Sequence, residues 1–124
     1  MNLLFDTNLL IEYSRNPGLP LFEDSINEGN HFFTSVICIA EFRVGVLARS
    51  LHWVDEIKEV FTPLAVTYEI ALLGGGFRQE LLNKGLDIPL PDHLIAATAL
   101  KHDLALVTLN KKDFPHQGLQ IYPV

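Results

Sequence analysis

The segment "LLFDTNLLIEY", residues 3–13, decides the fold. Three apolar residues run directly into Asp6, and apolar residues then recur at helical spacing. This junction predicts a buried strand over 2–5 and a helix over 7–15, with Asp6 between them. Asp6 is therefore either a helix cap or one corner of a charged site.

Outward from this segment, apolar strand patterns alternate with helical patterns along the whole chain. The predicted strands are 2–5, 31–35, 64–66, 104–108 and 119–122. The predicted helices are 7–15, 21–28, 36–50, 52–61, 68–84 and 92–102, with Pro89 and Pro91 in a loop before the last one. This alternation predicts an α/β fold, in which helices cover both faces of a mostly parallel sheet.

Length and composition indicate one globular domain over residues 1–124. The chain has 124 residues, of which 48% are hydrophobic, and this is enough to form a core without cross-links. The first fifteen residues lack the basic start of a signal peptide, and no apolar run is long enough to span a membrane. The single cysteine, Cys38, lies in an apolar run and is expected in the core of a cytoplasmic protein.

The net charge of −6 argues against broad electrostatic attraction to nucleic acid. It comes from nine Lys and Arg against fifteen Asp and Glu. If several of these acids bind one divalent cation, the net charge becomes about −4 and the field at the site becomes less negative. The acidic balance therefore does not exclude a metal-dependent enzyme that acts on nucleic acid.

Three polar residues are expected at the carboxyl edge of the sheet, where such folds bind their ligands. Asp6 follows the first strand, and Asn110 lies just beyond the strand over 104–108. Asp92 opens the helix that leads into that strand. The topology therefore allows all three side chains to meet.

Glu41 lies on a helical face that is otherwise apolar. In "VICIAEFRVGVLA" it shares this face with Ile37, Val44 and Ala48, which predicts that the face turns inward. A buried carboxylate is costly unless it is paired or binds a metal, and Arg43 lies on a different side of the helix.

Each acid also has a purely structural interpretation. Asp6 and Asp92 could each cap a helix, and Glu41 could pair with an arginine from another helix. Together, three acids and an Asn at one sheet edge favour a site for a hard cation, Mg²⁺ or Mn²⁺.

The order of these motifs resembles the PIN domain, and in particular the VapC-type ribonuclease toxins of bacterial toxin–antitoxin pairs. The matching motifs are "DTN" after the first strand, a helical Glu about 35 residues later, "PDHLIAATAL" and "LVTLNKKDF". The resemblance implies a three-layer α/β/α sandwich and Mg²⁺-dependent cleavage of RNA that leaves a 5′-phosphate and a 3′-hydroxyl.

The resemblance also implies roles for particular residues. Asp6, Glu41 and Asp92 would be the acidic metal centre, and Asn110 occupies a fourth position that is often Asp in the family. The missing carboxylate leaves open whether one or two metals bind, and Asp113 either contributes or caps a short turn. Thr7 and Thr108 would orient ligands or satisfy backbone groups at the strand ends. The expected partners are RNA, a small antitoxin protein and a second copy of the chain, with no membrane.

Other features have structural interpretations. "GGG" at 74–76 lacks the lysine of a phosphate loop and predicts close helix packing or a kink. His93 and His102 lie too far apart on one helix to share a metal. The aromatic residues Trp53, Phe22, Phe42 and Phe61 are expected in the core or at helix interfaces. Candidate RNA backbone contacts are Arg15, Arg43, Arg49, Arg78, Lys111 and Lys112.

Two other classes of protein remain as alternatives. A haloacid-dehalogenase-like phosphatase also begins with a strand and an Asp, but it requires a second Asp where this chain has Asn8. A non-catalytic binding module with a vestigial acidic pocket is the other alternative.

Overall fold

The structure, a computed structural model, describes residues 1–46 and 51–124. The last turn of the helix predicted over 36–50 and the candidate RNA contact Arg49 lie outside the described residues, as does Ala48.

Four parallel strands form the central sheet, in the order β3-β2-β1-β4. They are β1 (Asn2–Phe5), β2 (His31–Ser35), β3 (Thr62–Leu64) and β4 (Ala105–Val107). In β1, one of the two central strands, Leu3, Leu4 and Phe5 are fully buried. Such burial is typical of a parallel sheet covered on both faces.

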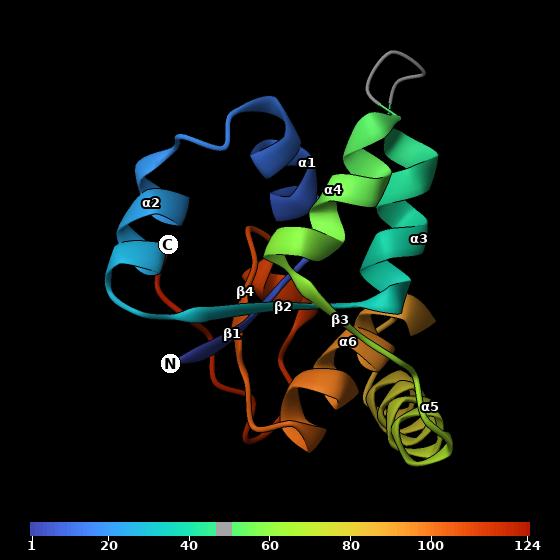
Figure 1. Cartoon of the computed structure of the whole chain (residues 1–124). Helices are drawn as coiled ribbons and strands as arrows, with labels where there is room; N and C mark the ends of the chain where they lie inside the picture. The colour runs from blue at the N-terminus through green and yellow to red at the C-terminus, as the bar shows by residue number, and fades with distance from the viewer. Residues whose placement is uncertain (47–50) are drawn as a thin grey trace.

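In the described residues, six α-helices and one short 3₁₀ helix surround the sheet (Figure 1). The α-helices are α1 (Thr7–Arg15), α2 (Pro20–Asn27), α3 (Val36–Gly45), α4 (His52–Val60), α5 (Tyr68–Asn83) and α6 (Leu90–Lys101), and the 3₁₀ helix is η2 (Lys111–Asp113). No helix in the described part of the chain is long and apolar enough to cross a membrane.

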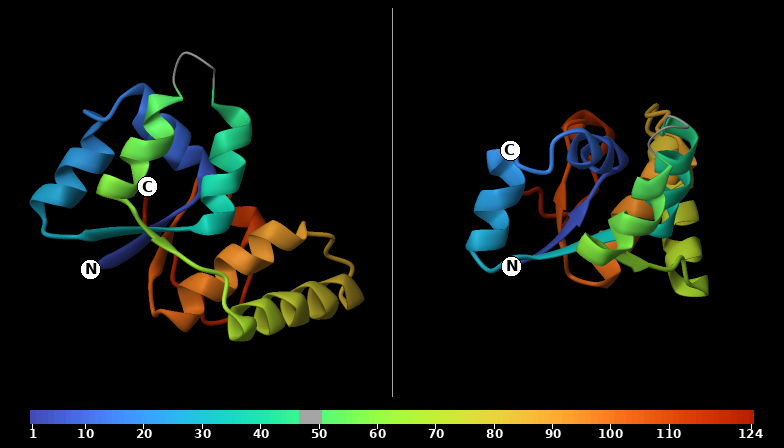
Figure 2. Two further views of the ribbon diagram at one scale, coloured as in Figure 1. Left: turned by 45° about the vertical axis from the view of Figure 1, so that its right-hand side comes forward. Right: turned by 45° about the horizontal axis from the view of Figure 1, so that its top comes forward.

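The order of the strands explains how the helices divide into two layers. From β1 to β2 to β3 the chain moves in one direction along the sheet, and from β3 to β4 it moves back. Because crossovers between parallel strands are right-handed, α1 to α4 lie on one face and α5 and α6 on the other. Figure 1 shows this division, and the left view of Figure 2 shows α6 between α5 and the sheet. The predicted α/β/α sandwich with a parallel sheet is therefore confirmed.

Four predicted boundaries were clearly wrong, and the predicted bounds of α2, α4, α5 and β4 also differ from the structure, each by one residue at one end or both. The structure has α3 ending at Gly45, where Val46 adopts extended backbone, and β3 over 62–64 instead of 64–66. Pro63 is tolerated within β3 because this is an edge strand. Helix α6 begins at Leu90, so Pro91 lies in its first turn. A proline is tolerated there because backbone N–H groups in the first turn have no partner within the helix, and the missing N–H of proline therefore costs nothing.

The fourth boundary is the strand predicted over 119–122. This segment makes only one parallel bridge to β4, between Leu106 and Ile121. Two backbone hydrogen bonds hold it there, from Leu106 N–H to the Gln120 oxygen and from Tyr122 N–H to the Leu106 oxygen, each 2.8 Å long.

Aromatic rings fill much of the core between the sheet and the first helical layer. The Phe5 ring lies 4.5 Å from that of Phe32 and 5.2 Å from that of Phe61. Phe22, Phe42 and Phe61 are buried and Trp53 is partly buried, as predicted. Cys38 is also buried, which raises the pKa of its thiol to about 12 and leaves it inert at neutral pH.

Gly74 lies where α5 packs most closely against α6. A Cβ atom at this position would stand 2.7 Å from Leu94 Cδ2 and 3.3 Å from the His93 carbonyl oxygen. At Gly75 and Gly76 a Cβ atom would meet nothing within 4 Å. The close packing predicted for "GGG" is therefore confirmed at its first glycine.

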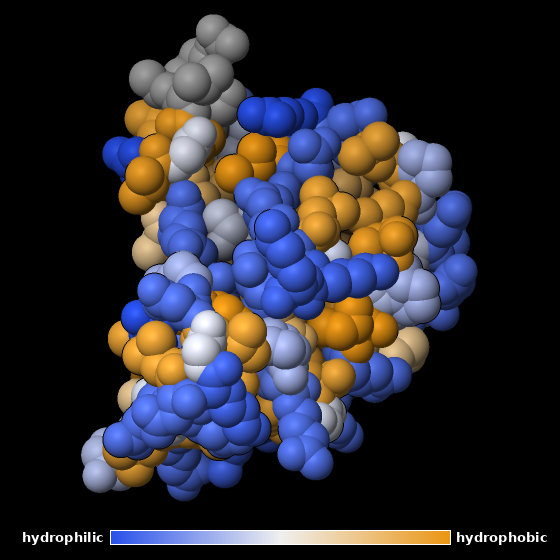
Figure 3. Space-filling view, turned by 180° about the vertical axis from the view of Figure 1, so that it is seen from behind, coloured by the Kyte–Doolittle hydropathy of each residue, from blue (hydrophilic) through white to orange (hydrophobic). Residues whose placement is uncertain are grey.

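The surface carries exposed apolar side chains in addition to charged ones. Several lie on α5, including Tyr68, Leu72 and Leu82. On the back of the molecule, polar side chains divide the apolar surface into separate patches (Figure 3).

Candidate active site

Asp6 is both a helix cap and a buried acid. It follows β1, and its Oδ1 accepts a 2.7 Å hydrogen bond from the Thr7 N–H at the start of α1. Its Oδ2 accepts a 2.9 Å hydrogen bond from Thr108 Oγ1, just beyond β4. Only 5% of the residue is exposed, and this burial raises the pKa of the carboxyl above its ordinary value although both hydrogen bonds lower it.

Thr108 connects the carboxyl ends of the neighbouring strands β1 and β4. Its hydroxyl donates to Asp6 and accepts a 3.0 Å hydrogen bond from the Asn110 N–H. It therefore fulfils both predicted alternatives, since it orients an acid and also satisfies a backbone group. Asn110 is thereby held beside the strand end that carries Asp6, and its side chain is partly buried.

Glu41 reaches this edge of the sheet from α3, but on the exposed surface. Thr7 Oγ1 donates a 2.7 Å hydrogen bond to Glu41 Oε1, so both predicted threonines bind an acid of the set. The prediction that the face of Glu41 turns inward was wrong. Because α3 is apolar almost all round, its periodicity did not show which side packs, and the buried side is that of Cys38 and Phe42.

Asp92 lies in the first turn of α6 and does not cap it. The N-terminal cap of this helix is Pro89, whose oxygen accepts a 3.1 Å hydrogen bond from the Asp92 N–H. Burial raises the pKa of the Asp92 carboxyl to about 6, with further contributions from the negative charges of Asp6, Asp113 and Glu41. Three acids from three other segments are therefore close enough to Asp92 to raise its pKa.

Asp113 belongs to η2 and lies nearer to these acids than its sequence position indicated. Its N–H donates a 3.0 Å hydrogen bond to the Asn110 oxygen, as in the predicted short turn. Its charge also raises the pKa of both Asp6 and Asp92. Asp113 thus adds negative charge near a position where the chain has Asn110.

The chemistry of these side chains fits a hard divalent cation. Oxygen is the only ligand type that they offer, and a cation would offset the repulsion that raises the pKa of Asp92. Within residues 1–46 and 51–124, no three His, Cys, Asp or Glu side chains already stand close enough together to hold one ion. Binding would therefore need movement of at least one carboxylate.

The candidate RNA contacts differ in how the chain itself uses them. Arg78 is engaged with Asp87 and with the Ile88 oxygen, and Arg15 lies 3.7 Å from Glu12. Arg43, Lys111 and Lys112 are exposed, as is Arg15.

A buried pair of histidines beside the site was not predicted. His93 follows Asp92 on α6, and its Nδ1 lies 2.9 Å from His116 Nε2. In the sequence, the histidine considered as a possible partner of His93 was His102 on the same predicted helix, but His102 is exposed. The sequence indicated only that His93 lies among apolar residues of α6 and is therefore buried. It could not indicate the partner, because His116 is 23 residues away.

The fold and the site together define an α/β protein with acids gathered at the carboxyl edge of a parallel sheet. Comparison with known families agrees: the family model described as the PIN domain matches residues 3–118. The chain belongs to the PIN domain family. This confirms the resemblance predicted from the sequence and removes the haloacid-dehalogenase alternative.

Known relatives are similar over nearly the whole chain. "Ribonuclease VapC1" of Rickettsia felis is 29% identical over an alignment of 136 residues that covers all of this chain and 97% of the relative. A DNA-bound VapBC structure from Salmonella typhimurium has a TM-score of 0.84 at 27% identity, covering 98% of this chain and 97% of that one. A toxin–antitoxin complex from Klebsiella pneumoniae has a TM-score of 0.69 at 30% identity, covering 98% of both chains.

Proposed function

We propose that this chain is a single-domain, Mg²⁺-dependent endoribonuclease and the toxin of a toxin–antitoxin pair in the cytoplasm. The observation that carries the proposal is that Asp6, held by Thr108, and Glu41, held by Thr7, lie at the carboxyl edge of the sheet close enough to Asp92 for their charges to raise its pKa. Relatives named as VapC ribonucleases support the same activity.

Asp6, Glu41 and Asp92 would hold the metal, with Asn110 as the fourth corner. Mn²⁺ is the alternative ion, because both ions prefer oxygen ligands. Three carboxylates offset the two charges of one cation, whereas the neutral Asn110 adds none. We therefore propose one tightly held ion and assign Asp113 to the surrounding charge.

The chain's own groups can perform the remaining tasks of phosphodiester hydrolysis. When bound, Mg²⁺ lowers the pKa of water and neutralises charge on the phosphate under attack. A carboxylate beside the ion would accept the proton of the attacking water. Thr108 and Thr7 keep Asp6 and Glu41 in place through the 2.9 Å and 2.7 Å hydrogen bonds.

Exposed cations close to the acids would hold the RNA backbone. Lys111 and Lys112 lie in η2 directly after Asn110, and Arg43 lies on α3 two residues beyond Glu41. Contacts of this kind position a phosphate but do not read the base sequence.

We also propose two protein partners. A small antitoxin with a basic residue near its tail would enter the acidic site, where a carboxylate can bind Arg or Lys. A second copy of the chain would cover exposed apolar residues such as those on α5. The toxin–antitoxin complex from Klebsiella pneumoniae is consistent with an antitoxin partner.

Two assays test this function. Purified wild-type protein should cleave RNA with Mg²⁺ and stop when a chelator is added, whereas the Glu41→Gln variant should cleave little. Expression of the wild type alone should slow growth, and co-expression of the neighbouring reading frame should restore it. Folded wild-type protein that binds RNA without cleaving it would instead support the non-catalytic binding module, and equal toxicity of the Glu41→Gln variant would contradict the active site.

A further inference from the structure

Two buried histidines connect α6 to the segment that follows η2. His93 is fully buried, and only 6% of His116 is exposed. His93 Nδ1 lies 2.9 Å from His116 Nε2, and His93 Nε2 lies 3.1 Å from the Ile88 carbonyl oxygen. The three groups therefore form one chain of hydrogen bonds.

The direction of these hydrogen bonds follows from their chemistry. The Ile88 carbonyl can only accept, so His93 Nε2 carries the proton and donates to it. In neutral His93, Nδ1 then has a free lone pair and accepts the proton of His116 Nε2. His116 Nδ1 has no partner among the described residues, and burial lowers the pKa of both histidines. A neutral pair thus has a single arrangement of protons.

Arg78 holds the same carbonyl from the other side. Its Nη1 donates a 2.6 Å hydrogen bond to the Ile88 oxygen and lies 2.5 Å from Asp87 Oδ1. Because Arg78 belongs to α5, the connection between α5 and α6 is tied to both helices immediately before the first turn of α6.

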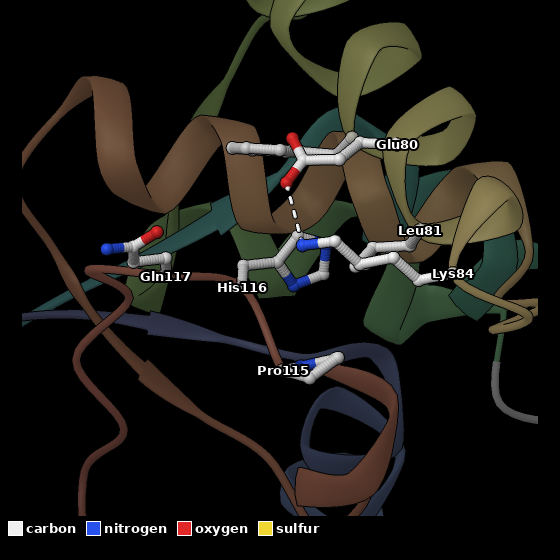
Figure 4. A pocket seen from close by; sticks show the side chains of 7 residues that line it. Glu80, Leu81, Lys84, Pro115, His116 and Gln117 are labelled. Atoms are coloured by element: carbon white, nitrogen blue, oxygen red, sulfur yellow. Dashed lines mark hydrogen bonds and ion pairs between the residues drawn. The ribbon is translucent and has the colours of Figure 1, made fainter.

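His116 is held in place against α5. Its ring makes an edge-on contact with Phe77 at 5.0 Å. Figure 4 shows His116 between the segment carrying Pro115 and Gln117 and the helix carrying Glu80 and Lys84. A cavity of about 270 Å³ lies beside the ring on this side. A ring fixed in this way can transmit the position of one segment to the other.

Each histidine is close in sequence to an acid of the candidate site. Asp92 immediately precedes His93, and Asp113 is three residues before His116. We infer that His93 and His116 are positioning residues that fix Asp92 relative to Asp113 through the hydrogen bonds from His116 to His93 and from His93 to the Ile88 carbonyl. Neither histidine touches the substrate in this role. The catalytic consequence rests on the ribonuclease function proposed above.

The test compares two substitutions of His116 in the full-length protein. Phenylalanine keeps a ring of similar size but cannot donate to His93, whereas the amide nitrogen of glutamine can replace Nε2 as the donor. We expect His116→Phe to speed amide hydrogen exchange at residues 92–94 at least tenfold and to lower kcat for RNA at least tenfold, with KM within twofold. His116→Gln should restore both the exchange rate and kcat to within threefold of the wild type.

A matched control separates positioning from loss of stability. Ile70→Val removes one methyl group from a buried residue near the start of α5, which lies beside Lys101 at the far end of α6 from His93, and should leave exchange at 92–94 and kcat unchanged. Wild-type exchange and kcat in His116→Phe would overturn the inference, as would equal defects in the Phe and Gln variants. If the wild type cleaves no RNA, the proposed function fails, and the exchange rates alone decide whether the histidines position Asp92.

Discussion

Replacing Asp92 with Asn should stabilise the metal-free protein while it abolishes RNA cleavage. In the folded chain the pKa of Asp92 is raised from 3.8 to about 6, so folding favours the protonated carboxyl. This difference corresponds to about 3 kcal/mol at full effect. Because the side chain is only half-buried, screening by water reduces it to about 1–2 kcal/mol.

The sign of the effect depends on pH. Below pH 3.8 Asp92 is protonated in both the folded and the unfolded state, so the wild type has the full contribution and pays no free energy for holding a charged carboxylate at this site. As pH rises through about 6 the folded carboxyl ionises, and that contribution is lost. Asn resembles the protonated acid and loses nothing. In chelator the variant should therefore melt roughly 4–8 °C above the wild type at pH 7.5, and at nearly the same temperature at pH 3.5.

Thermal unfolding followed by circular dichroism would measure this effect, first in chelator and then with Mn²⁺ added. Mn²⁺ should raise the Tm of the wild type more than that of the variant, because Asn lacks the charge that binds the ion. Asp24→Asn, on the exposed side of α2, makes the same chemical change away from the site and should respond to Mn²⁺ like the wild type. The reasoning is refuted if Asp92→Asn is no more stable than the wild type at pH 7.5, or if both gain equally from Mn²⁺.

Three further predictions concern the site and the helix packing. Asn110→Asp should tighten Mn²⁺ binding and lower the Tm in chelator, because it adds a fourth carboxylate; equal metal-induced shifts in Tm would place position 110 beyond reach of the ion. Thr108→Val should cost about 1–3 kcal/mol in urea unfolding, since it leaves Asp6 Oδ2 and the Asn110 N–H without this partner, whereas Thr108→Ser should retain most of the stability. Gly74→Ala should destabilise the protein by about 1–3 kcal/mol through its clash with α6, whereas Gly76→Ala should stabilise it by about 0.5–1 kcal/mol, and the opposite order in chemical denaturation would contradict the close packing of α5 against α6.

Local sequence predicted the bounds of an element correctly where its apolar pattern and its flanking turn or cap residues indicated the same ends. The bounds of β1 and α1 were predicted correctly because Asp6 ends the apolar run of β1 and caps α1. Those of β2 were predicted correctly because Gly29 ends the helix before it and α3 begins directly after Ser35. The end of α3 and the orientation of Glu41 were not, since an apolar residue on nearly every side removes the periodic signal.

The candidate site was predictable in its members and less so in its geometry. Topology brings Asp6 and Asn110 to one edge, but the hydrogen bond that joins Asp6 to Thr108 spans 102 residues. The influence of Asp113 on Asp92 and the contact between His93 and His116 likewise depend on how η2 packs against α6. Such contacts have no counterpart in local spacing.

Both edges of the sheet are protected against pairing with another chain. The C-terminal segment bonds to Leu106 along the open side of β4, and Pro63 interrupts the row of N–H donors along β3. Exposed strand edges are templates for intermolecular β-sheets, so blunted edges keep the folded protein from polymerising. Removing residues 119–124 would leave β4 open, and the shortened protein should form aggregates that bind thioflavin T while the full-length protein does not. We therefore expect that any shortened form of the chain has to retain residues 119–124 to stay free of aggregation.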